Sequence, residues 1–258
     1  MLLGILLLAH LIADFYFQTK KIADLKKEKF SVLLLHCGIY AITFAVVNFV
    51  FVNAKTAILA TFIIAVFHFV FDYVKIKFDE KYMNYAHHFC SFVLDQILHL
   101  SVIFVTYKLL NLAENTTKVF SKCIAFSNFE KIMILALLFA FLLQPVGVFI
   151  YKLLPFLCKE EYKTPHSEMF KDDKKKEQKE GDLIGQLERM IIAILLLCNQ
   201  YSAIGLVFTA KSIARSKKLE DKSFAEKYLI GTLVSLLIVL VTTILVKYFV
   251  PQITLVMY

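Results

Sequence analysis

The chain has 258 residues, of which 59% are hydrophobic and 19% are charged, and its mean hydropathy is +0.68. Water-soluble domains are closer to half apolar and a quarter charged, and the apolar residues here form uninterrupted runs long enough to cross a bilayer. The composition therefore excludes a soluble enzyme, a secreted domain and a DNA-binding domain. The formal charge of +8 comes from lysines in the connections between apolar runs, a pattern typical of membrane proteins rather than of nucleic-acid-binding proteins.

Eight apolar runs predict an all-α, polytopic integral membrane helical bundle with seven or eight transmembrane segments. They cover residues 2–17, 30–52, 56–74, 89–107, 132–151, 183–197, 202–214 and 228–246. Five of them span a bilayer comfortably. The sixth and seventh flank the polar turn Asn199-Gln200, and they could be two tilted spans or one re-entrant hairpin. Gln144-Pro145 predicts a kink in the fifth run.

Lysines and arginines predict the orientation of the bundle. Twenty-two of the 29 fall in connections on one face, and this bias alternates along the chain, which places the N-terminus outside and the lysine-rich connections in the cytoplasm. Four regions follow from this pattern. They are a four-helix His/Asp domain at residues 1–110, a connecting loop and fifth transmembrane helix at 111–158, a charged cytoplasmic loop at 159–181, and a membrane hairpin with the last helix at 182–258.

Seven histidines and aspartates interrupt the apolar runs of the first half, where ionisable side chains are costly and mark functional sites. Six of them form pairs four residues apart, so that on a helix both side chains of a pair point at one partner. The pairs are His10 with Asp14, His68 with Asp72 and Asp95 with His99, and His36 stands alone. Counted at about 1.5 Å per residue, all seven lie roughly 4 to 15 Å from the lysine-rich end of their helices. Four helices of alternating direction therefore bring these groups to one level.

This set predicts a dinuclear metal site that opens to the cytoplasm. The His-Asp pair at residues 10 and 14 recurs at 68 and 72, an offset of 58 that suggests two parallel halves with three or four ligands each. Imidazole and carboxylate ligands suit Zn, Mn or Fe(II), with zinc as the default metal. Gln18 and Gln96 are candidates to orient the ligands. A proton or ion pathway and purely structural pairing remain alternatives.

A second polar cluster is expected in the C-terminal half. Glu188 and Arg189 lie inside the sixth run, while Lys211 and Arg215 lie four residues apart at the end of the seventh. One interpretation is an ion pair of Glu188 with Lys211 or Arg215, together with ordinary snorkelling of the cations. The other is an anion pocket, formed by Arg189, Lys211 and Arg215, for a phosphate or a lipid headgroup.

The order and spacing of the polar motifs resemble a known family. The motifs are His10-x-x-Ala13-Asp14-Phe15-x-x-Gln18, His36, His68-x-x-x-Asp72-Tyr73-x-Lys75 and Asp95-Gln96-x-x-His99. Over roughly residues 1–110 the chain resembles the bacterial membrane family catalogued as domain of unknown function 3307, which implies a polytopic inner-membrane protein and no established activity. Residues 181–235 look like an extension found in longer members. By its general pattern the chain is also similar to proteins labelled membrane-bound metal-dependent hydrolases, which is an analogy only.

The resulting hypothesis is a hydrolase in which divalent metal activates water to attack a phosphoester or a related bond of an amphipathic, lipid-like substrate. The metal ligands would be His10, Asp14, His36, His68, Asp72, Asp95 and His99, and one of the three aspartates could instead be the general base. The expected partners are the lipid bilayer and a lipid or phosphorylated substrate, with no nucleic acid. Two rival hypotheses are a proton- or cation-coupled transporter that uses the same residues and a structural membrane subunit. The weakly polar outer halves of the first four helices favour a one-sided site over a transport pathway.

Overall fold

The computed structural model describes residues 1–82, 84–158 and 172–253, and the regular structure of this part is helical. The chain divides into two compact units, Met1–Leu137 and Leu138–Tyr258. An all-α architecture is thus confirmed for the described residues. Most of the predicted charged loop, residues 159–171 with His166, lies outside them, whereas the helix that follows begins at Asp172, within the predicted loop.

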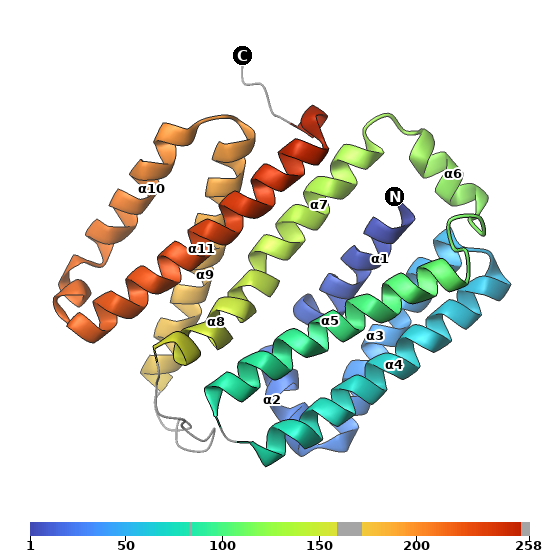
Figure 1. Ribbon diagram of the computed structural model, residues 1–258, viewed down its shortest axis with the longest axis horizontal. Helices are drawn as coiled ribbons and strands as arrows, with labels where there is room; N and C mark the ends of the chain where they lie inside the picture. Colours follow the sequence, from blue (N-terminus) through green and yellow to red (C-terminus); the bar gives the residue numbers. More distant parts are fainter. Residues whose placement is uncertain (83, 159–171, 254–258) are drawn as a thin grey trace. The chain divides into compact units, whose positions relative to one another are not determined.

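The first unit is built from long hairpins and one sharp bend (Figure 1). α1 (Leu2–Leu11) continues through a π-helical turn (Ile12–Tyr16), and the chain then bends by 76° into the short helix α2 (Lys20–Glu28). α3 (Phe30–Phe51), α4 (Ala54–Lys81) and α5 (Tyr85–Leu109) follow as antiparallel neighbours, with α3 packed against α4 and α4 against α5. α6 (Lys118–Ala125) packs against α3, and α7 (Phe129–Leu143) runs from the first unit into the second.

Local sequence signals account for the bend and the short helix that follows it. Thr19 caps α2 by accepting a hydrogen bond from the backbone N–H of Ile22 at 3.3 Å. The helix is amphipathic, with Ile22 and Leu25 on the side opposite most of its charged residues. Because α2 packs against α3, its lysines are held at one end of the first unit, which we call the lysine-rich end.

One stripe of each long helix faces the interior of the first unit. On α4 the buried residues are Ala57, Ala60, Ile64, His68, Asp72 and Ile76, and α3 and α5 have stripes with the same spacing of three to four residues. Away from the lysine-rich end, these stripes form an apolar core. The outward faces are also apolar, since Ile42 and Phe62 are 66% and 64% exposed, as expected for helices surrounded by lipid.

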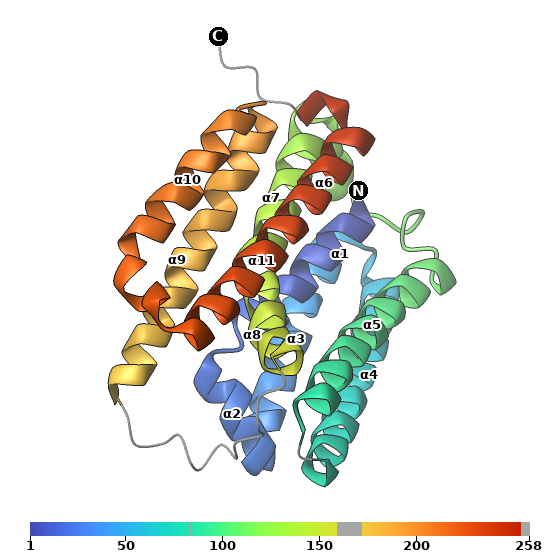
Figure 2. The same cartoon turned by 60° about the vertical axis from the view of Figure 1, so that its left-hand side comes forward.

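The second unit consists of α8 (Pro145–Leu157), α9 (Asp172–Leu197), α10 (Tyr201–Ala214) and α11 (Lys222–Phe249), besides the end of α7. Figures 1 and 2 show α9, α10 and α11 side by side, and α9 packs against both of the others. The helix is interrupted where the kink is expected, because α7 ends at Leu143 and Pro145 opens α8.

Within the described residues, five helical segments are long and apolar enough to cross a membrane, and the bent pair formed by α1 and α2 brings the total to six. The five are Phe30–Phe51, Ala54–Lys81, Tyr85–Leu109, Phe129–Leu157 and Lys222–Phe249. With 14 residues, α10 is shorter than a span. The composition and these helices define a membrane-type helical protein, while the count of seven or eight spans and the outside N-terminus remain predictions.

Candidate metal site in the first unit

The seven histidines and aspartates of the first half occupy buried positions of α1, the π-helical turn that follows it, α3, α4 and α5, in the layer next to the lysine-rich end. Each is at most 7% exposed. They replace apolar residues at positions where the helical repeat still points inward, which is why the fold buries them. The structure therefore brings all seven together in one polar layer beside the apolar core.

A π-helical turn sets the direction of Asp14. The backbone N–H of Phe17 bonds to the carbonyl of Ile12 at 2.9 Å, which is the wider spacing of a π-helix. Such turns occur frequently at functional sites, because the extra residue rotates the side chains of the turn around the helix axis. Asp14 lies in the middle of this turn and is directed at His36 of α3.

The first cluster of possible metal ligands is centred on the Nε2 atom of His36. This atom lies 3.2 Å from His68 Nε2, 3.3 Å from Asp14 Oδ1 and 3.4 Å from Asp72 Oδ2. Asp14, His36 and His68 offer ligand atoms that all lie within 4.8 Å of one another, and all three residues are buried. Two facing imidazole nitrogens between two carboxylates can share one proton or jointly bind one cation.

The second cluster comprises Asp72, Asp95 and His99, whose ligand atoms also lie within 4.8 Å of one another. Lysines accompany its carboxylates. Lys26 Nζ donates to Asp72 Oδ2 at 2.6 Å, and Lys75 Nζ donates to Asp95 Oδ2 at 2.7 Å. A third possible group, Cys37 with His68 and Asp72, shares two residues with the other clusters. The first cluster combines residues from both sequence repeats, whereas the second contains residues of the second repeat alone, so the ligand sets follow the predicted halves only in part.

The remaining predicted residues form the hydrogen-bonded surroundings of the clusters. His10 belongs to neither cluster, and its ring nitrogens contact the Tyr40 hydroxyl at 3.0 Å and Gln96 Oε1 at 3.2 Å. The Gln96 amide donates to Asp14 Oδ2 at 2.9 Å and to Asp95 Oδ2 at 3.2 Å. Gln18 accepts a hydrogen bond from Lys26 Nζ at 2.9 Å. Both glutamines thus bond to groups of the site.

Several buried nitrogen and oxygen atoms of the clusters lack a hydrogen-bond partner among the described residues. They are His36 Nδ1, His68 Nδ1, Asp95 Oδ1 and His99 Nε2. An unpartnered buried polar atom costs about 1–3 kcal/mol, so native proteins rarely leave one without a ligand or an ordered water. Four such atoms in one layer could therefore bind ordered water or an additional group.

Three residues of the site escape sequence reasoning. Tyr40 stacks on His68 with the ring centroids 3.6 Å apart and fixes the orientation of that imidazole, but a tyrosine in an apolar run looks like an ordinary core residue. Lys26 counts in the sequence only as a connecting-loop cation, and Lys75 appears only as a member of the motif His68-x-x-x-Asp72-Tyr73-x-Lys75, without a role of its own. The amphipathic pattern of residues 20–28 was the available signal that Lys26 lies on a helix rather than in a loop.

The cluster predicted in the second half is divided between different partners. Arg189 is buried, and its guanidinium donates to the carbonyls of Leu142 and Leu143 at 2.5 and 2.8 Å, at the break between α7 and α8. Lys211 pairs with the buried Glu188 at 2.6 Å, which is the ion pair that one of the two interpretations describes. The anion pocket remains a prediction, and two of its three cations have protein partners.

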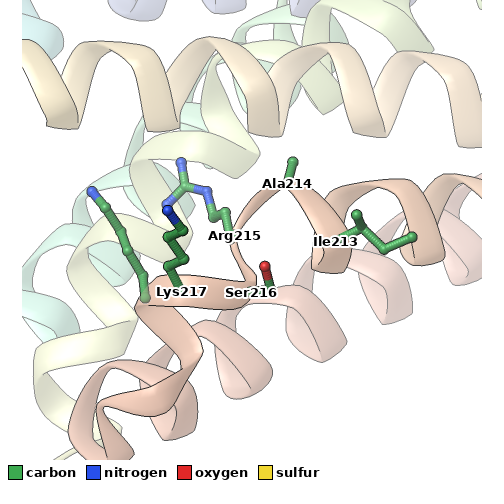
Figure 3. A pocket seen from close by; sticks show the side chains of 6 residues that line it. Ile213, Ala214, Arg215, Ser216 and Lys217 are labelled. Carbon is green, nitrogen blue, oxygen red and sulfur yellow. The ribbon is translucent and has the colours of Figure 1, made fainter.

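Arg215 instead lines a surface hollow of about 530 Å³. The hollow is formed by residues 213–218, at the end of α10 and in the connection to α11. The side chains of Arg215 and Lys217 extend to the same side of this turn (Figure 3). In the first unit His87 and His88 lie 3.5 and 3.6 Å from the two carboxylate oxygens of Asp79, away from the clusters described above. They therefore have a structural partner at the connection between α4 and α5.

These features define a class of protein, a membrane-type helical bundle with a buried His/Asp cluster that could bind metal. Residues 2–127 match the family described as "Protein of unknown function (DUF3307)", and the resemblance drawn from the motifs is thereby confirmed. No curated protein and no solved structure matches the chain. The matched segment contains every residue of both clusters, so the site belongs to the part of the chain that the family covers.

Proposed function

We propose that the protein is a metal-dependent hydrolase of the cytoplasmic membrane, with one divalent ion held by Asp14, His36 and His68 and with Asp72 beside it. The observation that carries the proposal is the set of three distances around His36 Nε2, which are 3.2, 3.3 and 3.4 Å. Zinc bonds to nitrogen and oxygen of about 2.0–2.1 Å in a tetrahedron imply ligand-to-ligand edges of about 3.3 Å. The three separations that meet at His36 Nε2 therefore match the edges of a tetrahedral zinc site, while His68 Nε2 and Asp72 Oδ2 lie 3.9 Å apart.

The charges in the layer favour one ion over two. Three buried carboxylates face two ammonium groups, so with neutral histidines the layer has a net charge of −1. One divalent ion changes this to +1, whereas two ions would leave +3 within a region of low dielectric. Both lysines are bonded to carboxylates of the second cluster, where they already supply positive charge. The first cluster is consequently the better place for the metal.

A divalent ion in this position would supply the chemistry of hydrolysis, because it activates a water molecule for attack on an ester bond. Asp95 is the carboxylate best placed to accept the proton of that water, since its Oδ1 has no hydrogen-bond partner among the described residues. Gln96 holds Asp14 and Asp95 in place, and Tyr40 holds His68 by stacking. The amphipathic substrate would reach this layer from the lysine-rich end.

The same contacts form a chain from Lys26 through Asp72, His36, Asp14 and Gln96, which is the observation that favours a proton or cation pathway. The chain continues to His10 and Tyr40, where the apolar core begins. In that core Leu6, Phe44, Ile64 and Ile103 are at most 1% exposed. A transport pathway needs polar groups on both sides of the membrane. A layer that is closed on one side by the core supports the hydrolase better.

The experiment that tests the proposal is elemental mass spectrometry on detergent-purified protein. We expect about one equivalent of zinc, manganese or iron per chain, lost in His36→Ala and in Asp14→Asn. His87→Ala is the matched control, because it removes a histidine outside the clusters. The metal-loaded protein is then assayed for release of phosphate from lipid phosphates and lipid pyrophosphates. Two equivalents would restore a dinuclear site, and a folded protein without bound metal would contradict the proposal and favour the proton pathway.

A further inference from the structure

We propose that Lys26 and Lys75 together form the binding site for the phosphate group of the substrate, an anionic amphiphile that carries a phosphomonoester or a similar dianionic headgroup. This inference rests on the proposed function, because it takes the metal of the first cluster as bound. In this inference the anion is bound in the first unit, by the two lysines that lie beside the candidate metal ligands. The inference thereby assigns a substrate class to the site.

The two lysines come from different elements and meet at the same layer. Lys26 belongs to α2, beyond the 76° bend, and Lys75 belongs to the end of α4. Their side chains are 10% and 18% exposed, whereas the Asp72 and Asp95 side chains to which they bond are 2% and 4% exposed. The lysine side chains are therefore the more exposed members of the two ion pairs. A headgroup entering from the lysine-rich end would meet the lysines before the carboxylates.

Electrostatics give these lysines a role when the metal is present. Without metal, each ammonium group has a carboxylate partner, and the layer has a net charge of −1 that repels anions. A divalent ion reverses the sign to +1, and carboxylates polarised by the ion hold the ammonium groups less strongly. Both ammonium groups can then donate charge-assisted hydrogen bonds to an anion. Metal binding therefore converts the site from one that repels a phosphate group to one that attracts it.

The chemistry around the lysines favours phosphate on an amphiphile. Lysine binds phosphate as a compact point charge, and two lysines match the two charges of a phosphomonoester dianion better than the single charge of a carboxylate. An aromatic ring lies beside one of the two ammonium groups, since Lys75 Nζ is 5.7 Å from the Phe92 ring centroid. Phe17, at the bend that precedes α2, is 49% exposed. A headgroup bound here would thus have its apolar chain next to aromatic and lipid-facing surfaces.

The first arm of the test measures binding of inorganic phosphate to zinc-loaded, full-length protein in detergent by isothermal titration calorimetry. We expect Lys26→Met and Lys75→Met each to weaken phosphate binding about tenfold or more, the effect of losing one charge-assisted hydrogen bond. Lys21→Met, an exposed position on the same helix, should leave the affinity within about twofold. Lys26→Arg keeps the charge and should retain most of the affinity, which separates loss of the anion contact from misfolding.

The second arm identifies the source of the phosphate. Phosphate titrations are repeated in phosphatidylcholine nanodiscs with and without phosphatidic acid. If phosphatidic acid lowers the apparent affinity for inorganic phosphate in the wild type but not in Lys26→Met, the headgroup of a membrane lipid occupies the site. If phosphatidic acid has no effect while inorganic phosphate still binds through both lysines, a water-soluble phosphate compound is the ligand. Both results support two-lysine phosphate recognition.

Zinc content, measured on every sample, separates this inference from the proposed function. Protein that retains no zinc contradicts the proposed function, and the inference fails with it. Zinc-loaded Lys26→Met and Lys75→Met proteins that bind phosphate as tightly as the wild type would overturn the inference alone, and so would a zinc-loaded wild type that binds no phosphate. Activity of the loaded enzyme is not needed for any of these readouts.

Discussion

The contact between Lys26 and Asp72 predicts a strong energetic coupling between α2 and α4 in the absence of metal. Lys26 Nζ lies 2.6 Å from Asp72 Oδ2, and the two side chains are 10% and 2% exposed. Removing one partner of a buried pair costs about 3–5 kcal/mol. Since Lys26 is partly exposed, we expect Lys26→Met to cost about 3 kcal/mol, the lower end of that range.

Replacing the carboxylate partner instead of the lysine should lower the free energy of unfolding by a smaller amount. Asp72→Asn leaves an ammonium group that can turn towards water, so we expect a cost of about 1.5 kcal/mol. The double variant should lose about 2 kcal/mol, because neither side chain is then left as a buried unpaired charge. These values correspond to a coupling free energy of about 2.5 kcal/mol, near the upper end of the range for residues in contact.

The assay is equilibrium unfolding of the four proteins in mixed detergent micelles that contain a metal chelator, followed by circular dichroism. The control is a second cycle with Lys77→Met and Glu80→Gln, a pair with side chains 56% and 50% exposed on the surface of α4. Exposed pairs of this kind contribute little to stability. A coupling between Lys26 and Asp72 no larger than that of the control pair would refute the docking of α2 over the site.

Three further variants, with one control, probe other contacts. Tyr40→Phe keeps the ring on His68 but removes the hydroxyl next to His10 Nδ1, so we expect a loss of about 1 kcal/mol in unfolding experiments. Arg189→Leu removes two hydrogen bonds to the carbonyls of Leu142 and Leu143 and should destabilise the second unit by about 3 kcal/mol, measured as faster limited proteolysis of that unit. Gly147→Ala would place a Cβ atom 3.2 Å from the guanidinium of Arg189 and should lower the thermal unfolding midpoint. Gly205→Ala, a helical position with open space around it, should leave that midpoint unchanged or raise it.

Much of the first unit can be predicted from the sequence, because the spacing of residues along each single helix determines which polar side chains face inward and at what depth. Pairs such as His68 and Asp72 lie four residues apart on a buried stripe, and their depth depends only on the rise of a helix. The stripes of α3, α4 and α5 therefore meet as expected. The particular ligand sets are a different matter, because they depend on side-chain directions across helices, which spacing along one helix does not specify.

The parts that escape prediction depend on contacts between elements. Lys26 reaches Asp72 only because the chain bends after Phe17 and α2 packs on α3, and no local pattern specifies the angle of that bend. Asp14 lies in a π-helical turn, which the sequence of an apolar helix does not reveal. Arg189 was expected to bind an anion or to snorkel, and its actual partners are backbone carbonyls that become available only where Pro145 interrupts the helix.

The bond between Arg189 and the break in the α7–α8 segment also constrains the order of events during synthesis. The arginine follows its carbonyl partners by 46 and 47 residues, which a ribosome adds in roughly 2 to 9 s. During this interval the carbonyls of Leu142 and Leu143 would be unpaired in lipid, and a buried arginine entering the membrane alone is equally unfavourable. The arginine therefore supplies the donors that the two carbonyls lack, and the carbonyls supply the acceptors that the arginine lacks. We expect the α7–α8 segment to remain at the insertion machinery until α9 arrives, so that the two enter the bilayer as one unit.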